Sequence, residues 1–254
     1  APGDGGPVYG TAAVVTALVV VGSLLAHELG HAFVALRAGI PVHDITLWML
    51  GGVSRIEGEP DDPRTDLRVA AVGPAVSLAV AAGASVAAIV GTAVDGPRIV
   101  VACLWSVGWI NLVLAVFNLV PAAPLDGGRV LRALLWRRSG DRVGAALGAT
   151  RAGRIFSATL VGLGVVAVAG RALVSGIWLM LLGWFLLDAS RAEESRIIVG
   201  RDLAGVWVRA VMTNDPWTLP ASMTVADALA GPVLAHRCSA FPVVEAEGTV
   251  DGLV

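Results

Sequence analysis

The chain has 254 residues, of which 56% are hydrophobic and only 15% are charged, with a mean hydropathy of +0.77 and a formal net charge of −2. Soluble domains carry roughly 25% charged residues, so this composition excludes an ordinary soluble protein and predicts one that resides in the lipid bilayer. The slightly negative charge argues against a general nucleic-acid binder, and the two distant cysteines provide no disulfide framework.

Five apolar segments are long enough to cross a bilayer as helices, which takes about 17–25 residues each. They cover residues 11–36, 67–94, 98–120, 152–170 and 172–188. None of them alternates apolar and polar residues as a barrel strand does, so we expect an all-α polytopic membrane domain. The chain starts without Met on a polar, loop-like stretch, and we expect a first transmembrane helix to be missing from this numbering.

A polar stretch, residues 39–66, separates the first two predicted helices. Branched residues alternate in Val42-His43-Asp44-Ile45-Thr46-Leu47, and glycines follow at positions 51, 52 and 58. This pattern predicts a short membrane-associated β hairpin or sheet.

Arginine placement predicts the orientation of the helices. The loop after the first helix, the connection between the third and fourth helices, and the stretch after the fifth are rich in arginine, whereas the other two connections hold one each, Arg98 and Arg171. Positive-inside bias therefore places the arginine-rich segments and the C-terminus in the cytoplasm. We expect a multi-pass protein of a bacterial cell membrane, in which the first and third helices both run toward the cytoplasm.

Residues 27–31 read HELGH, at the cytoplasmic end of the first predicted helix. His27 and His31 are about 40° apart around a helix and one turn apart along it, so both imidazoles can bind one metal ion. Glu28 is close enough to serve as a general base for a water molecule there. Ionisable residues inside a membrane span are rare and usually functional. The alternative is a polar helix end at the membrane interface.

A zinc site with two histidines needs a third protein ligand. The stretch FNLVPAAPLDGGR, residues 117–129, follows the third helix, so Asp126 is expected at about the same depth as HELGH. Its prolines and glycines predict irregular backbone packed inside protein. The alternative is a turn in which Asp126 caps the next helix. His43 is a rival ligand, but the hairpin lies past the helix end, where a surface position is expected.

HELGH late in one span, with N-x-x-P-x-x-P-L-D-G-G-R after a later one, resembles the site-2 protease family of intramembrane zinc metalloproteases. Gly51-Gly52 and Ala71-Val72-Gly73-Pro74-Ala75 add to the resemblance, which covers about residues 11–190. It implies one Zn²⁺ bound by His27, His31 and Asp126, with Glu28 activating water and Asn118 helping to hold the scissile carbonyl. Ser77 stands where the related G-P-x-x-N pattern often has Asn, so we assign it no role.

The segment from Val208 to Val254 resembles the start of a CBS (cystathionine β-synthase) domain. It has a Val-Met-Thr opening, a TVADAL helix start with Thr224 as N-cap before Asp227, and then SAFPVV and GTVDGLV strands. Such modules work in pairs and often bind adenine nucleotides, which implies a nucleotide ligand and a homodimer through paired modules. A small α/β appendage without a ligand is the alternative.

We therefore predict a transmembrane zinc metalloprotease domain over residues 1–198 and a partial cytosolic CBS-like α/β domain over residues 199–254. The predicted activity is that of a metalloendopeptidase that cleaves transmembrane protein substrates near the cytoplasmic side and is modulated by the CBS module. The alternative is a metal-dependent membrane transporter or a non-catalytic membrane scaffold with a cytosolic sensor domain. Transport would predict inverted repeats, and we find no internal repeat in the sequence.

Overall fold

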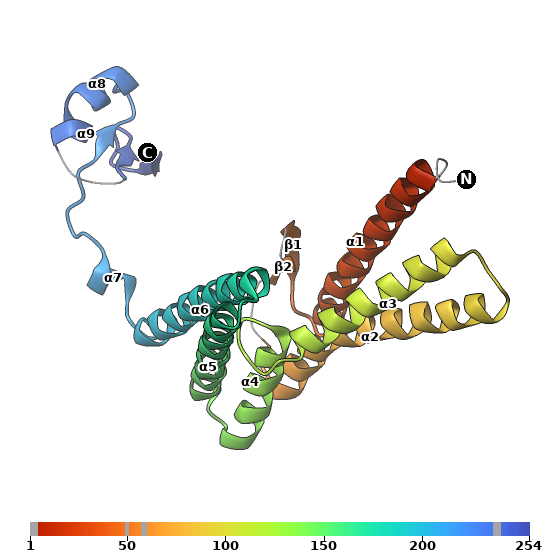
Figure 1. Cartoon of the computed structure of the whole chain (residues 1–254). Coiled ribbons are helices and arrows are strands. Elements are labelled where there is room, and N and C mark those ends of the chain that lie inside the picture. The colour runs from red at the N-terminus through yellow and green to blue at the C-terminus, as the bar shows by residue number, and fades with distance from the viewer. Residues whose placement is uncertain (1–4, 49–50, 57–59, 236–239) are drawn as a thin grey trace. The chain divides into compact units, whose positions relative to one another are not determined.

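The computed structural model describes residues 5–48, 51–56, 60–235 and 240–254. They divide into two compact units, Ala1–Arg201 and Asp202–Val254. Five helices in the described residues are long and apolar enough to cross a membrane (Figure 1). They are α1 (Gly5–Arg37), α2 (Pro63–Ala93), α3 (Arg98–Asn118), α5 (Arg142–Ala169) and α6 (Leu173–Asp202). Each predicted span overlaps one of them, so the prediction of a polytopic helical membrane protein is confirmed.

Helix boundaries follow capping side chains more closely than they follow hydropathy. The carboxylate of Asp62 accepts the backbone N–H of Arg64 at 2.7 Å and so begins α2, with Pro63 in the first turn. Asp141 does the same for α5 by accepting the N–H of Gly144 at 2.9 Å. Helix α5 therefore begins well before residue 152, where the apolar segment starts, because a helix can continue beyond the lipid.

Helix α2 is central to the first unit and packs against α1, α3 and the shorter helix α4 (Asp126–Ser139). Its buried face consists mainly of small residues, among them Ala70, Gly73, Ser77, Ala81 and Ala88. Gly108 of α3 lies so close that an added Cβ would be 3.3 Å from the carbonyl oxygen of Ala81. Small residues allow this close approach where lipid supplies no hydrophobic force between helices.

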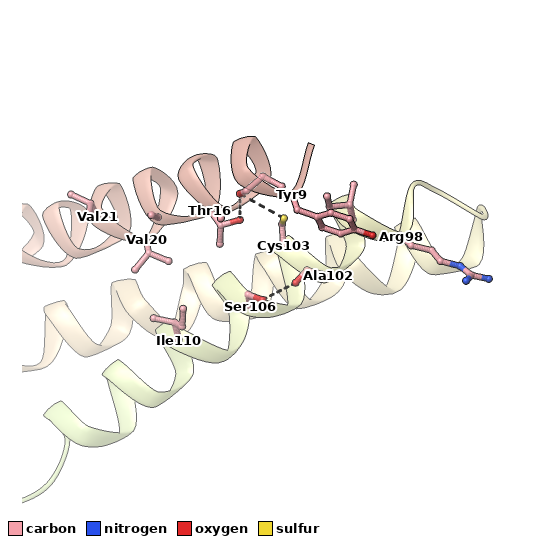
Figure 2. Close-up of a pocket in the computed structure, with 13 residues that line it drawn as sticks. Tyr9, Thr16, Val20, Val21, Arg98, Ala102, Cys103, Ser106 and Ile110 are labelled. Carbon is pink, nitrogen blue, oxygen red and sulfur yellow. Dashed lines mark hydrogen bonds between the residues drawn. The ribbon is translucent and has the colours of Figure 1, made fainter. Parts of the chain in front are cut away.

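Helices α1 and α3 run parallel, and an apolar groove of about 840 Å³ lies between their N-terminal halves. Figure 2 shows Tyr9 of α1 near Arg98 of α3 at one end of this groove, and Val21 of α1 with Ile110 of α3 at the other. Residue numbers thus rise in the same direction along both helices. The parallel arrangement brings the C-terminal half of α1 and the chain that follows α3 to the same end of the bundle.

Helices α5 and α6 form a close pair through glycines. A Cβ on Gly176 of α6 would meet the carbonyl oxygen of Gly164 at 2.7 Å, and one on Gly183 would meet the carbonyl oxygen of Ser157 at 2.8 Å. Arg154 of α5 also pairs with Glu194 of α6 at 2.7 Å. The two helices therefore pack backbone to backbone over much of their length.

The predicted hairpin is present as β1 (Val42–Trp48) and β2 (Gly51–Ile56), which pair antiparallel and contact α1. Gly51 lies opposite Trp48, and Gly52 lies opposite Leu47. The two glycines therefore begin the second strand. Residues 49–50 and Gly58 lie outside the described residues.

The second unit is a small α/β piece, as predicted. Its elements are α7 (Val208–Val211), β3 (Leu219–Pro220), α8 (Val225–Ala230), α9 (Pro232–Ala235), β4 (Pro242–Val244) and β5 (Val250–Leu253). The sheet has the order β3-β4-β5, with β3 parallel and β5 antiparallel to β4. The predicted cap is confirmed, because the Oγ1 of Thr224 accepts the N–H of Asp227 at 3.2 Å. His236 and Cys238 lie outside the described residues.

Candidate metal centre

The HELGH histidines lie on the face of α1 that packs against α2. His27 and His31 are buried, with 2% and 4% of their surface exposed, and their Nε2 atoms are 3.3 Å apart. The helical spacing of four residues therefore brings both rings to one point. A pair of buried imidazoles needs polar partners to offset desolvation, and α2 and α4 supply them.

Asp126 comes to the same point from α4. Its Oδ2 is 3.1 Å from the Nε2 of His27 and 3.3 Å from the Nε2 of His31. Leu125 is the N-cap of α4, and Asp126 is the first residue of the helix, with its carboxylate directed at the histidines. The alternative in which Asp126 caps the helix is therefore not what the structure shows. The expected common depth of Asp126 and HELGH is observed.

The three donor atoms form a nearly equilateral triangle with sides of 3.1, 3.3 and 3.3 Å. Zinc in proteins is usually tetrahedral, with metal–ligand distances of ~2.0–2.1 Å, so its ligand atoms lie ~3.3 Å from one another. The observed triangle thus matches three corners of a zinc tetrahedron. The donor set, two imidazole nitrogens and one carboxylate oxygen, is also one that zinc accepts in catalytic sites.

The hydrogen bonds behind the rings determine which nitrogen faces the centre. The Nδ1 of His31 lies 2.6 Å from the carbonyl oxygen of Val69, which can only accept, so Nδ1 donates and a neutral ring presents an Nε2 lone pair to the centre. The Nδ1 of His27 lies 2.9 Å from the Oγ of Ser77. The Nε2 lone pair of His31 and the carboxylate of Asp126 converge on one point and repel one another, a repulsion that a cation between them relieves, so the residues fit a metal ion.

Gly73 leaves the space that such an ion needs. A Cβ at this position on α2 would lie 2.6 Å from the Nε2 of His27 and closer still to the Nε2 of His31. Any side chain would therefore displace the two donor atoms. Glycine is required here by the close approach of a helix backbone to the site rather than by an unusual φ angle.

Asp126 is the most exposed of the three donors. Its side chain is 17% exposed, more than either histidine side chain, so the site is more open on the α4 side.

Two other predicted site residues are less closely defined. Glu28 is buried on α1 between the two histidines in sequence, with 9% of its surface exposed. Asn118 is the half-buried last residue of α3, and its contact with a scissile carbonyl stays a prediction. His43 lies on β1, where side chains are outside what the structure describes.

Sequence reasoning missed the residues of α2 that support the histidines. Ser77 contacts His27 and the carbonyl of Val69 accepts from His31, yet neither was assigned a role. A backbone carbonyl leaves no trace in a sequence. Ser77 could have been found from its spacing of four residues after Gly73, which places both on one helix face.

A protein-family model, "Peptidase family M50", matches residues 15–96 and 88–163, which together cover more than half of the chain. The chain belongs to peptidase family M50. A second model, "CBS domain", matches residues 208–254 of this M50 chain, which confirms that resemblance.

Named relatives agree with this assignment. A Mycobacterium tuberculosis protein, Rip3, is named as a zinc metalloprotease, and its name marks that activity as not demonstrated. It is 46% identical to this chain, and the match covers 94% of this chain and 61% of the relative's own length. The zinc metalloprotease MJ0392 of Methanocaldococcus jannaschii is 29% identical over 88% of this chain and 62% of its own length. The M50 chain thus spans about three fifths of the length of these relatives.

A solved structure supports the fold. The site-2 protease from Methanocaldococcus jannaschii superposes with a TM-score of 0.54 and 28% sequence identity, covering 70% of this chain and 76% of that chain. The suspected site-2 protease membership is therefore confirmed. Five apolar helices and this family membership identify a multi-pass membrane protein, and membership of a zinc metalloprotease family implies Zn²⁺ as the metal for the triangle of donors.

Proposed function

We propose that this M50 chain is an intramembrane zinc endopeptidase that cleaves transmembrane proteins near the cytoplasmic side of the membrane. One observation carries the proposal: two buried histidines of α1 and the partly exposed Asp126 of α4 form a triangle of donor atoms of zinc dimensions, and the buried Glu28 follows His27 in the sequence. Ionisable groups at membrane depth are expensive, and a functional site is the usual reason for them.

Each residue has a distinct role in the proposed reaction. A bound Zn²⁺ would polarise the substrate carbonyl and lower the pKa of water. His27, His31 and Asp126 hold the metal, and Ser77 with the Val69 carbonyl keeps the imidazoles oriented. Glu28 takes a proton from the attacking water and returns it to the leaving amine. Asn118 is proposed to donate a hydrogen bond to the carbonyl oxygen under attack.

Substrate presentation is proposed to involve the hairpin. A transmembrane helix hides its carbonyls in hydrogen bonds, so the bond to be cut must first become extended. The strands β1 and β2 pair with each other and contact the helix that carries HELGH. We propose that the unwound substrate adds to an edge of this hairpin as a further strand, which would hold its backbone extended.

Reconstitution with a reporter transmembrane substrate tests the proposed function. Cleavage should stop when a chelator removes the metal and return when zinc is added back. Asp126→Ala should bind zinc much more weakly through the two remaining histidines and should lose cleavage, since it deletes one corner of the donor triangle. Zinc bound at one equivalent with no cleavage of any transmembrane reporter would contradict the protease assignment and favour the transport or scaffold alternative.

The roles of the C-terminal module are proposals that rest on the CBS match over residues 208–254. We propose that it lies in the cytoplasm of a bacterial cell, pairs in a homodimer and binds an adenine nucleotide that modulates cleavage. Titration of a longer chain with adenosine nucleotides tests this point. Saturable binding that changes the cleavage rate supports it, and no binding up to millimolar nucleotide contradicts it.

A further inference from the structure

One face of α2 carries the groups that contact the two histidines of α1 and the helix α4. Asp66, Val69, Gly73 and Ser77 lie within about 80° of one another around the helix. Ser77 and the Val69 carbonyl bond the histidines, and Gly73 packs against their Nε2 atoms. Asp66 is the remaining polar member of this face, and it contacts α4 instead of α1.

Asp66 forms a buried ion pair with the helix that carries the third ligand. Its side chain is 0% exposed, and Arg132 of α4 bonds it in a fork, with Nε 2.9 Å from Oδ2 and Nη2 2.7 Å from Oδ1. Arg129 of α4 approaches the same Oδ1 to 3.5 Å. A buried charge is maintained only with close partners, and the planar fork of arginine fixes geometry as well as charge.

The ion pair and the metal ligand belong to one rigid element. Arg132 lies six residues after Asp126 in α4, about 9 Å along the helix axis. The loop before α4 is tied elsewhere, because the Oγ of Ser190 donates to the carbonyl of Ala123 at 2.6 Å and so joins this loop to α6. The fork from Arg132, with the longer contact from Arg129, joins α4 to Asp66 of α2, the helix that orients the histidines.

We propose that Asp66 is a positioning residue for the metal centre: its ion pair with Arg132 holds α4 in the register that places Asp126 against His27 and His31. The inference rests on the proposed function, because it assumes that these three residues bind zinc. Supporting partners of metal ligands typically change metal affinity 10–100-fold when they are removed. Asp66 would act less directly, because it sets the position of helix α4, which carries the ligand Asp126.

The test measures zinc affinity of the full chain in detergent by chelator competition, alongside thermal melting of the metal-free protein. Asp66→Asn keeps the size of the side chain and removes its charge, and it should weaken zinc binding roughly 10-fold or more. Asp66→Glu should recover part of this loss because the carboxylate returns. Glu194→Gln is the matched control: it breaks the Arg154 pair between α5 and α6 and should leave zinc affinity unchanged.

A double-mutant cycle separates positioning from general stability. If Asp66 acts through Asp126, Asp66→Asn should have little effect on the residual zinc affinity of an Asp126→Ala chain. An equal loss in both backgrounds, or a zinc affinity of Asp66→Asn within twofold of wild type, would overturn the inference. Arg132→Lys, which keeps the charge and loses the fork, replaces Asp66→Asn in the cycle if the latter does not fold. A wild type that binds no zinc would instead overturn the proposed function.

Discussion

Gly73 is the position at which an added side chain would most directly disturb the metal centre. It lies on α2 under both histidine Nε2 atoms, and an added Cβ would come within 2.6 Å of His27 Nε2. Helix packing alone often tolerates alanine in place of glycine. Here the neighbouring atoms are the proposed metal ligands, so the substitution acts on metal binding before it acts on the fold.

Gly73→Ala should therefore lower zinc affinity by 10-fold or more, the range seen when support of metal ligands is lost. Gly83→Ala is the matched control on the same helix, because no atom lies within 4 Å of a Cβ added there. Zinc competition assays on both variants check the prediction. Unchanged zinc affinity in Gly73→Ala would show that the donor triangle does not form as described.

Residue types predicted which three donors converge but not the groups that orient them. His27, His31 and Asp126 were singled out because their spacing and the arginine-derived topology placed them at one depth, and the structure brings their donor atoms within 3.1–3.3 Å of one another. Their role as zinc ligands stays a prediction. Ser77 and Asp66 were missed because their roles depend on the rotation of α2 against α1 and α4. Hydropathy indicates which residues can face lipid, but it does not specify that rotation.

The packing of α5 against α6 depends on glycine. A Cβ on Gly176 would meet the carbonyl oxygen of Gly164 and the backbone nitrogen of Val168 at 2.7 and 2.8 Å. Backbone atoms cannot rotate away as a flexible side chain can. Any larger residue must therefore push the two helices apart.

Gly176→Ala should destabilise the protein by ~1–3 kcal/mol through overpacking. Gly162→Ala on α5 is the control: open space surrounds its Cβ position, and replacing a helical glycine stabilises by ~0.5–1 kcal/mol. Thermal melting of both variants in detergent measures the difference. Equal melting temperatures would mean that the two helices are not in close contact.

The hairpin was predicted from alternation, but the position of its glycines was not. The backbones of Gly51 and Gly52 pair with Trp48 and Leu47 at the start of β2. Glycine is depleted in strands, so composition alone does not assign these two residues to a strand. Hydropathy located the apolar part of α5, residues 152–170, but not the start of the helix, which the capping side chain of Asp141 marks.

Gly52→Pro tests strand addition by the substrate. Proline removes a backbone donor and disfavours a paired strand, so cleavage of a transmembrane reporter should fall by more than zinc content does. Zinc content is measured on the same preparation as the internal control. A cleavage rate equal to that of wild type would contradict the role proposed for the hairpin.

At the scale of the whole molecule, the chain consists of a membrane unit, Ala1–Arg201, and a smaller unit, Asp202–Val254. All three proposed ligands and the α2 residues that support them lie in the first unit. The metal centre should therefore form without the second.

A chain that ends at Arg201 should bind one zinc with an affinity within about threefold of that of the whole chain, a difference of well under 1.4 kcal/mol. The comparison uses chelator competition on both proteins in the same detergent. Loss of zinc binding on truncation would show that the C-terminal unit is needed to build the metal centre, contrary to the division described here.

Glu28→Gln tests the central claim most directly, because it keeps the shape of the side chain and removes only its ability to accept a proton. Zinc content and cleavage of a transmembrane reporter are measured on wild type and variant together. We predict one zinc per chain in both and a loss of cleavage of at least 100-fold in the variant, in line with general acid–base catalysis. A variant that retains zinc and cleaves as fast as wild type would contradict the account.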